Sequence, residues 1–311
     1  MKLIRGLLHN ASNSNEFTNG CVASIGNFDG LHLGHRQLLT HLVQKSNELK
    51  LPSIIISFEP LPTEFFRSPP PKRIYPLRDK IRLLKQLGVD YSMNLRFNQQ
   101  LANMDAKDFV QQVLLKQFKV HYLVVGDDFR FGKQRKGDFQ LLQSMGCQAG
   151  MIVRDTPTCY NNDKRISSSR IREYLAIGNI KASNRLLGSP YQLSGRVRHG
   201  NKRGRTIGFP TLNLRMPDTI APAHGVYAVR ITGLANKTLT GVASLGKNPT
   251  VAGKEVRLET YVFDYKENAY GKYVCIQLDK FLRPEQYFKS FDALKQQIDK
   301  DADIALQYYR Q

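Results

Sequence analysis

Two histidines in the first half of the chain, His32 and His35, have the type and spacing needed for phosphate chemistry. They follow an apolar run typical of a buried strand, Cys21–Ile25, and a turn that contains glycine, and leucines at helical spacing come after them. A strand-to-helix turn of this kind binds anions through backbone N–H groups and the helix dipole. Two imidazoles on one face of the helix start suit a phosphate that gains charge during a reaction. The spacing also allows a plain tight turn at Asp29-Gly30 or a metal site.

Two further stretches in this half could complete a nucleotide site. The loop Gly126–Gly132 follows the predicted strand His121–Val125. It therefore lies at the carboxyl end of a strand, which is where open α/β sheets bind ligands. The run Lys164–Arg172 places serines and arginines at the start of a predicted helix, which suits the β- and γ-phosphates of a nucleotide. Taken singly, each stretch has a simpler explanation: a surface turn with a solvated arginine, or helix capping by Ser167 or Ser168.

A stretch in the second half could hold magnesium. If Pro210–Leu214 is extended, Thr211 and Asn213 project to the same side of the strand. Two neutral oxygen ligands together with nucleotide phosphates suit Mg²⁺, which keeps few protein ligands. The basic run Lys202–Arg205 could cover phosphates, although it lacks the residue order of a P-loop. By itself, this stretch is better explained as a basic surface turn beside an ordinary strand.

The elements that position these residues fall into two domains, which a chain of 311 residues can accommodate. Strand and helix patterns alternate over residues 20–180 and predict an α/β domain with a parallel sheet. One of the helices of this domain is expected from Met104 to Phe118. After Ser189-Pro190 a period of two with recurrent glycine turns predicts a β-barrel or sandwich, and a helix follows from about Phe291 to Tyr309. The expected domains are residues 1–187 and 188–311.

The charge of the chain is strongly positive, with 46 lysines and arginines against 26 aspartates and glutamates and a net charge of +20. Such a surface attracts polyanions, so nucleic acid and phosphate-rich small molecules are both candidate partners. The excess is spread along the chain, without a basic tail, an RNA-recognition motif or a finger pattern. This distribution favours nucleotides over nucleic acid.

Cysteine usage and hydropathy indicate the compartment. The four cysteines form no CxxC pair, which argues against a zinc ribbon or a redox motif and fits a reducing cytoplasm. No apolar run approaches the ~20 residues of a membrane span, and the apolar start Met1–Leu8 is interrupted too soon for a signal peptide. We expect a cytoplasmic protein with no membrane partner.

The wording of the three stretches in the first half resembles known motifs. GNFDGLHLGH, at residues 26–35, resembles the HxGH signature of the nucleotidylyltransferase superfamily, in the form found in bacterial bifunctional riboflavin kinase/FAD synthetases. GDDFRFG resembles that family's second nucleotide-contacting motif, and ISSSRIR resembles its ISSTxxR motif with a serine in place of threonine. The resemblance implies a Rossmann-like FMN adenylyltransferase domain in which His32, His35 and Arg172 are catalytic. The nucleotide-binding residues that it implies are Gly26, Phe28, Asp29, Gly34, Asp128, Arg165, Ser168 and Ser169.

The second half resembles the riboflavin kinase part of the same family. GRTIGFPTLNL, at residues 204–214, is similar to the signature GRxLGFPTANL and departs from it at Leu212, where the family usually has alanine. The resemblance implies that Glu259 takes the proton from the ribityl 5′-hydroxyl. The sequence departs from the family two residues later, where Tyr261 stands at a position that is often histidine. A lone glutamate on a strand is usually solvent-facing, so the role of Glu259 follows from the resemblance alone. The residues implied to bind nucleotide and Mg²⁺ are Arg205, Gly208, Thr211 and Asn213.

The resemblance covers about residues 20–305 and implies synthesis of FAD in two steps. The barrel would phosphorylate riboflavin with ATP and Mg²⁺, and the first domain would adenylylate the FMN product with a second ATP, releasing pyrophosphate. The expected partners are riboflavin, FMN, FAD and ATP, with no nucleic acid, and the chain is expected to be a monomer or a weak homo-oligomer.

Two alternative functions stay open. One is another nucleotidylyltransferase or an enzyme similar to class I tRNA synthetases, since these share HxGH. The lack of a KMSKS-like segment and the presence of the kinase signature argue against it. The other is a nucleic-acid-binding protein, which only the charge suggests and which would bind with a steep dependence on salt.

Overall fold

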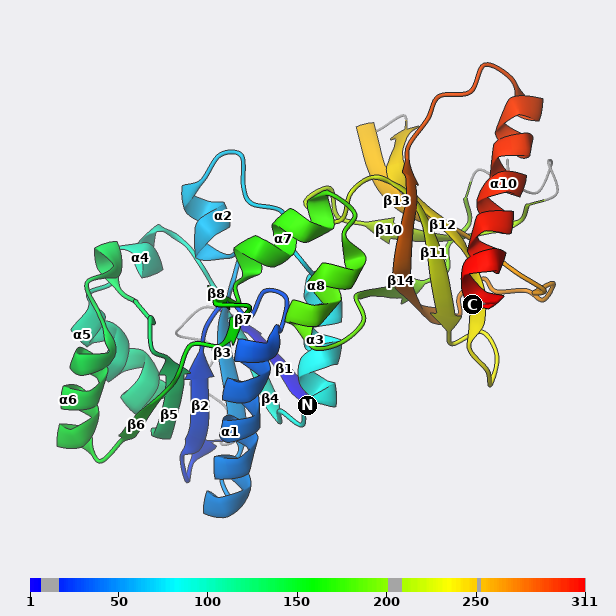
Figure 1. Ribbon diagram of the computed structural model, residues 1–311. Helices are drawn as coiled ribbons and strands as arrows, with labels where there is room; N and C mark the ends of the chain where they lie inside the picture. Colours follow the sequence, from blue (N-terminus) through cyan, green and yellow to red (C-terminus); the bar gives the residue numbers. More distant parts are fainter. Residues whose placement is uncertain (7–16, 201–208, 251–252, 311) are drawn as a thin grey trace. The chain divides into compact units, whose positions relative to one another are not determined.

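The computed structural model describes residues 1–6, 17–200, 209–250 and 253–310 (Figure 1). By contacts the chain divides into an N-terminal unit, Met1–Pro71 with Lys80–Ser167, and a C-terminal unit, Lys72–Asp79 with Ser168–Gln311. The domain boundary expected after residue 187 stays a prediction. Among the described residues, no helix has the length and apolar character needed to cross a membrane.

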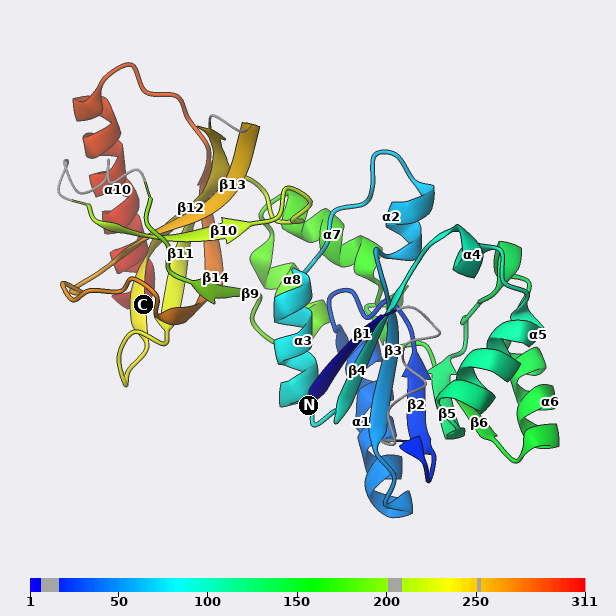
Figure 2. The ribbon, with the colours of Figure 1, turned by 180° about the vertical axis from the view of Figure 1, so that it is seen from behind.

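The N-terminal unit is organised around a sheet of six parallel strands in the order β1-β4-β3-β2-β5-β6 (Figure 2). The expected Rossmann-like sheet is thus confirmed. Because parallel strands end at the same edge of a sheet, the turns after the neighbouring strands β2 and β5 lie close together. The strands are β1 Lys2–Gly6, β2 Cys21–Ile25, β3 Ser53–Glu59, β4 Tyr91–Arg96, β5 Val120–Gly126 and β6 Ile152–Thr156.

The helices of this unit follow the strands, as the alternating pattern predicts. Helix α1, Leu33–Leu49, begins directly after His32. The helix expected from Met104 to Phe118 consists instead of two pieces, α5 Ala106–Asp108 and the π-helix η3 Phe109–Gln117, whose apolar residues enter the core. The other elements are α2 Pro62–Phe66, α3 Leu77–Gln86, α4 Gln99–Ala102, η4 Lys133–Arg135, α6 Phe139–Ala149, and the short strands β7 Tyr160–Asn161 and β8 Lys164–Arg165. Helix α3 begins in the segment assigned to the C-terminal unit.

The C-terminal unit contains six antiparallel strands in the order β10-β13-β12-β11-β14-β9. The two edges of the sheet meet where the N–H of Arg198 donates to the carbonyl of Asn213 over 2.9 Å, so the sheet forms a nearly closed barrel. The expected barrel with a C-terminal helix is confirmed. The elements are α7 Ser168–Ala176, α8 Ile180–Leu187, β9 Gln192–Arg196, β10 Thr211–Met216, β11 Gly225–Thr232, β12 Leu239–Thr250, β13 Gly253–Val262, β14 Tyr273–Pro284 and α10 Phe291–Arg310.

The C-terminal helix α10 lies along the barrel (Figure 1), and small residues take part in the contact. Ala302 and Ala305 lie in one apolar cluster with Val226 of β11. Arg283 of β14 donates to both carboxylate oxygens of Asp301 over 2.7 to 3.1 Å, and in this bidentate pair Asp301 is buried and Arg283 partly buried. Apolar contact and the ion pair together fix the helix against the strands.

Candidate active sites

The turn after β2 is held in one shape by buried side chains. Three of its residues have positive φ angles: Phe28 (49°), Gly30 (93°) and Leu31 (45°). Such angles are uncommon for phenylalanine and leucine, and burial of both side chains maintains them. Gly26 leaves room for the Phe28 ring, because a Cβ atom at this position would lie 3.1 Å from it. The turn therefore offers a defined backbone surface next to the start of α1, where Asp29 is buried as well.

The two histidines lie together at the start of α1. His32 is the N-cap residue, and its Nδ1 atom accepts a hydrogen bond from the backbone N–H of His35 at 3.4 Å. The two rings stack, with centroids 3.7 Å apart and planes 15° apart, and Gly34 lies beside the His32 ring. Because Nδ1 accepts this hydrogen bond, a neutral His32 carries its own proton on Nε2. The Nε2–H group is therefore available as a donor toward an anion.

Burial and neighbouring charges keep both imidazoles neutral at pH 7. Burial lowers the pKa of His32 to about 4, and the Arg165 guanidinium acts in the same direction. Burial, then His32 and the Lys80 ammonium, hold the pKa of His35 well below its usual range. The histidines are thus hydrogen-bonding groups rather than cations. Arg165 and Lys80 supply positive charge beside them.

The two aspartates of the loop after β5 have different roles. Asp127 accepts hydrogen bonds from the N–H and the hydroxyl of Thr158, at 2.9 and 2.8 Å, and so ties the loop to the segment after β6. Asp128 pairs with Arg165 of β8, and both side chains are about half exposed. The structure therefore places Asp128 and Arg165 together, and Arg165 is close enough to His32 to affect its pKa.

Of the four residues expected to hold the triphosphate, Arg165 is in the N-terminal unit and the other three are in the C-terminal unit. Ser168 and Ser169 begin α7, and Arg172 follows in its second turn. The Arg172 Nε–H group donates to the carbonyl of Lys72 over 2.7 Å. These three residues and the two histidines are not brought together within one unit, so their shared site stays a prediction.

The proposed kinase residues share one face of the barrel wall. In the register of β10 with β13, Thr211 lies opposite Tyr261 and Asn213 lies opposite Glu259. Residues directly opposite in an antiparallel pair project to the same face, and so do residues two apart on one strand. Thr211, Asn213 and Glu259 are therefore neighbours, as the expected kinase site requires. Arg205 and Gly208 lie outside the described residues.

The amide of Asn213 has an unused oxygen that suits a cation. The residue is 7% exposed. Its Nδ2 atom donates to the carbonyl and the hydroxyl of Thr211 at 3.3 and 3.4 Å, whereas its Oδ1 atom is buried without a hydrogen-bond partner among the described residues. An orphaned buried acceptor calls for an unseen partner. Oδ1 and the neighbouring Thr211 hydroxyl are hard oxygen ligands of the kind Mg²⁺ prefers.

Metal binding by the histidines gains no support. In the part of the chain that the structure describes, no group of three or more His, Cys, Asp or Glu side chains could hold a metal ion. The Nδ1 atom of His32 is already used as a hydrogen-bond acceptor. The phosphate interpretation of these residues stays a prediction.

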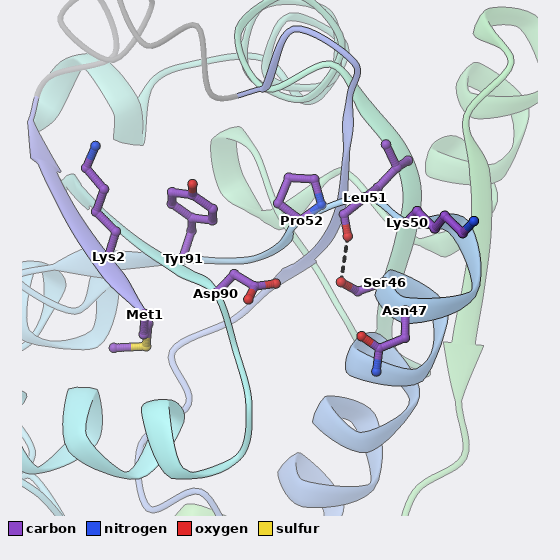
Figure 3. A pocket seen from close by; sticks show the side chains of 9 residues that line it. All are labelled: Met1, Lys2, Ser46, Asn47, Lys50, Leu51, Pro52, Asp90 and Tyr91. Carbon is purple, nitrogen blue, oxygen red and sulfur yellow. Dashed lines mark hydrogen bonds between the residues drawn. The ribbon is translucent and has the colours of Figure 1, made fainter.

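A hollow of about 920 Å³ lies at the other end of the N-terminal sheet (Figure 3). Pro52 and Asp90, which line it, come directly before β3 and β4, so it lies at the amino ends of the strands. The Asp90 carboxylate accepts from the N–H and hydroxyl of Ser53, at 2.9 and 2.7 Å. This hydrogen bonding is structural, and we assign no function to the hollow.

Comparisons with known proteins give both halves of the chain a family. The family model described as FAD synthetase matches residues 14–170, and the one described as riboflavin kinase matches residues 187–309. A bifunctional riboflavin kinase/FMN adenylyltransferase of Escherichia coli is 44% identical, covering 99% of this chain and 98% of its own. The Haemophilus influenzae protein of the same name is also 44% identical, covering 99% of both chains.

A solved structure from Streptococcus pneumoniae, described as a macrolide-efflux protein, has the same fold. It covers 97% of both chains with a TM-score of 0.79 and 30% sequence identity. Its description names a different activity, although the likeness extends over nearly the whole chain. The relatives and the two matching family models confirm the resemblance that the motifs indicate. The chain belongs to the family of bifunctional riboflavin kinase/FMN adenylyltransferases.

Proposed function

We propose that the chain makes FAD from riboflavin in two ATP-dependent steps. The half that matches riboflavin kinase transfers the γ-phosphate of ATP to riboflavin and yields FMN. The half that matches FAD synthetase joins FMN to the AMP part of a second ATP and releases pyrophosphate. The observation that carries this proposal is the match of both families, in series, to one chain.

In the adenylyl transfer, an oxygen of the FMN phosphate attacks the α-phosphorus of ATP while the bond to pyrophosphate breaks. The nucleophile is already an anion, so the step needs no general base. His32 and His35 act as neutral hydrogen-bond donors toward the oxygens that gain charge. Arg165 neighbours His32 and adds positive charge, and Asp128 orients it through their ion pair. Positioning and charge stabilisation are the main tasks of a protein in such transfers.

The nucleotide phosphates are held by backbone groups and by the start of α7. The turn at Gly26–Gly30 and the first turn of α1 present N–H groups to anions. Ser168, Ser169 and Arg172 hold the triphosphate and the departing pyrophosphate through hydroxyl donors and a guanidinium. This role is supported by the motif order in the sequence and by the start of α7 at Ser168.

In the phosphoryl transfer, the riboflavin 5′-hydroxyl oxygen attacks the γ-phosphorus of ATP while the bond to the departing ADP breaks, and Glu259 accepts the hydroxyl proton. Thr211 Oγ1 and Asn213 Oδ1 are the oxygens that would hold Mg²⁺. When bound, the ion neutralises phosphate charge as a Lewis acid. Arg205 and Gly208 contact the phosphates in this proposal. It is supported by the shared face of the β10 and β13 residues.

Replacing Asn213 by alanine removes one of the two proposed Mg²⁺ ligands. We expect the Mg²⁺ concentration for half-maximal riboflavin phosphorylation to rise at least about tenfold, the effect typical of a damaged metal site. Initial rates over a Mg²⁺ titration measure it. FAD synthesis from supplied FMN serves as the internal control and should keep its Mg²⁺ dependence. An unchanged titration curve for the kinase would show that Asn213 is not a ligand.

Product analysis tests the proposed function directly. The purified chain is incubated with riboflavin, ATP and Mg²⁺, and the flavins are separated by chromatography. FMN should form first and FAD later. FMN without FAD would contradict the role of the N-terminal half. Neither product, even from riboflavin reduced with dithionite, would contradict both roles and favour the nucleic-acid alternative that the net charge of +20 suggests.

We infer that the enzyme works in the cytoplasm on small molecules, as a monomer or a weak homo-oligomer. The four cysteines are all free thiols, which fits a reducing compartment. The positive charge attracts anionic nucleotides and flavin phosphates, so nucleic acid is not needed to explain it.

A further inference from the structure

Lys80 of α3 is a buried lysine that contacts the turn after β2. The residue is 5% exposed. Its Nζ atom donates to the backbone carbonyl of Asn27 at 3.3 Å and to the Ser57 hydroxyl at 3.4 Å. Lysine is among the residues least often buried, because its charge is costly to remove from water. A lysine at this position therefore indicates a function that an apolar residue could not fulfil.

Lys80 connects the ends of three neighbouring strands. Ser57, near the end of β3, donates its hydroxyl proton to Asn94 Oδ1 on β4 over 2.5 Å, and both side chains are buried. Asn27 lies just past the end of β2, which is next to β3 in the sheet. The Lys80 ammonium and the side chains of Ser57 and Asn94 thus form a chain of hydrogen bonds at the carboxyl ends of β4, β3 and β2. The turn after β2 lies at this same edge of the sheet.

The hydrogen bond to Asn27 also directs a donor toward the ligand side. The Asn27 carbonyl and the Phe28 N–H belong to one peptide plane, in which the two groups point in opposite directions. When the carbonyl points inward to Lys80, the Phe28 N–H points away from the interior. Fixing the carbonyl therefore fixes the direction of an N–H group in the proposed anion site.

The ammonium has an electrostatic effect on the histidines as well. It acts together with burial and His32 to lower the pKa of His35. The charged or titratable groups that act on His35 are His32 at the same helix start and Lys80 of α3, while Arg165 of β8 acts on His32. Lys80 thereby supports the neutral form in which His35 serves as a donor.

We propose that Lys80 is a positioning residue of the adenylyl transfer: it holds the turn Gly26–Gly30 in the shape that presents N–H groups and both histidines to the phosphates. It acts through Asn27 and the turn, without contacting the substrate. This inference rests on the proposed function of the N-terminal half.

The variant Lys80→Met keeps the length of the side chain and removes its charge and donors. In the full chain we expect kcat/KM for FMN adenylylation to fall about 30-fold or more, while riboflavin phosphorylation stays within about twofold. Lys85→Met, an exposed lysine on the same helix, is the matched control and should leave both rates unchanged. Adenylylation within about threefold of the unchanged protein would overturn the proposal.

A double-mutant cycle separates positioning from loss of folded enzyme. If Lys80 acts by positioning His35 at the start of α1, Lys80→Met costs less than about threefold in a His35→Ala background, because the donor that it positions is already absent. The same factor in both backgrounds would indicate unfolding or an independent effect and would overturn the positioning role. Ser57→Ala, which removes one acceptor and keeps the charge, should lower adenylylation by about threefold to tenfold. An unchanged rate would also count against the proposal.

The two possible failures are distinguishable. If the unchanged chain makes no FAD, the proposed function of the N-terminal half fails. If the unchanged chain makes FAD and Lys80→Met makes it equally well, the function stands and only the role of Lys80 is overturned.

Discussion

The double variant His32→Ala, His35→Ala is expected to lose FAD synthesis while it keeps riboflavin phosphorylation. Each alanine removes a proposed donor at the start of α1, beside the turn after β2 that we propose binds phosphate. Removal of one such donor typically costs about 10²–10³ in rate, so kcat/KM for FMN adenylylation should fall by about 10³ or more. The measurement is the rate of FAD formation from FMN and ATP. The rate of FMN formation from riboflavin, on the same preparation, reports whether the chain is folded.

A third histidine on α1 provides a matched control. His41 lies farther along the helix, where its ring contacts the Tyr122 hydroxyl at 3.1 Å. It belongs to no proposed site, so His41→Ala should make FAD at the rate of the unchanged chain. Full FAD synthesis by the double variant would remove the histidines from the mechanism.

The lowered pKa values of His32 and His35 make the free energy of unfolding depend on pH. An unperturbed histidine titrates near pH 6.5, whereas folded His32 titrates at about 4. Between these values the unfolded chain binds more protons. The folded form is therefore fully stabilised above pH 6.5 and loses stability as the pH falls, by up to about 1.4 kcal/mol per pH unit for each histidine. Chemical unfolding at two pH values should show a smaller pH effect in the double variant.

The first motif and its surroundings are predictable from sequence because the signals are local. The apolar run before the turn becomes β2, and α1 begins at Leu33, directly after the first histidine. The alternation of strand and helix patterns is likewise sufficient to predict a parallel sheet. The neutrality of the two histidines is not predictable in this way, since it depends on burial and on Arg165 and Lys80, which are distant in sequence.

The π-helix shows where a periodic pattern fails. Phe109, Val113 and Leu114 are buried, as a helix with an apolar stripe predicts. The same positions fit both an α-helical and a wider π-helical turn over this short length, so the packing of the core decides between them. Sequence therefore gives the buried residues here but not the backbone hydrogen bonding.

The register between strands that are distant in sequence also cannot be predicted from motifs. Two-residue periodicity predicts that Thr211 and Asn213 share a side, yet it does not specify which strand lies opposite. Only the pairing of β10 with β13 places Glu259 next to Asn213. Barrel and sandwich have the same strand pattern, and the contact of Arg198 with Asn213 distinguishes them. Lys80 is missed for a similar reason, because an amphipathic helix ordinarily leaves its lysines solvated.

The variant Glu259→Gln should lose riboflavin phosphorylation while it keeps adenylylation of supplied FMN. The amide has the size of the carboxylate but cannot accept the proton of the 5′-hydroxyl. General-base catalysis contributes about 10²–10⁴ in rate. Because the transition state of phosphoryl transfer is loose and demands little of the nucleophile, we expect a loss near about 10². Initial rates of FMN formation at saturating ATP and Mg²⁺ measure it.

The kinetic constants of Glu259→Gln distinguish a general base from a purely structural carboxylate. A base lost from a bound substrate lowers kcat and leaves KM for riboflavin and ATP nearly unchanged, because binding does not use the proton transfer. Glu267→Gln, at an exposed glutamate of the same unit, should change neither constant. A Glu259→Gln enzyme with kcat within about threefold would mean that the hydroxyl loses its proton to water or phosphate. Thr211, Asn213 and the nucleotide would then account for the kinase site without Glu259, and the position of Glu259 beside Asn213 would serve the architecture of the metal site instead.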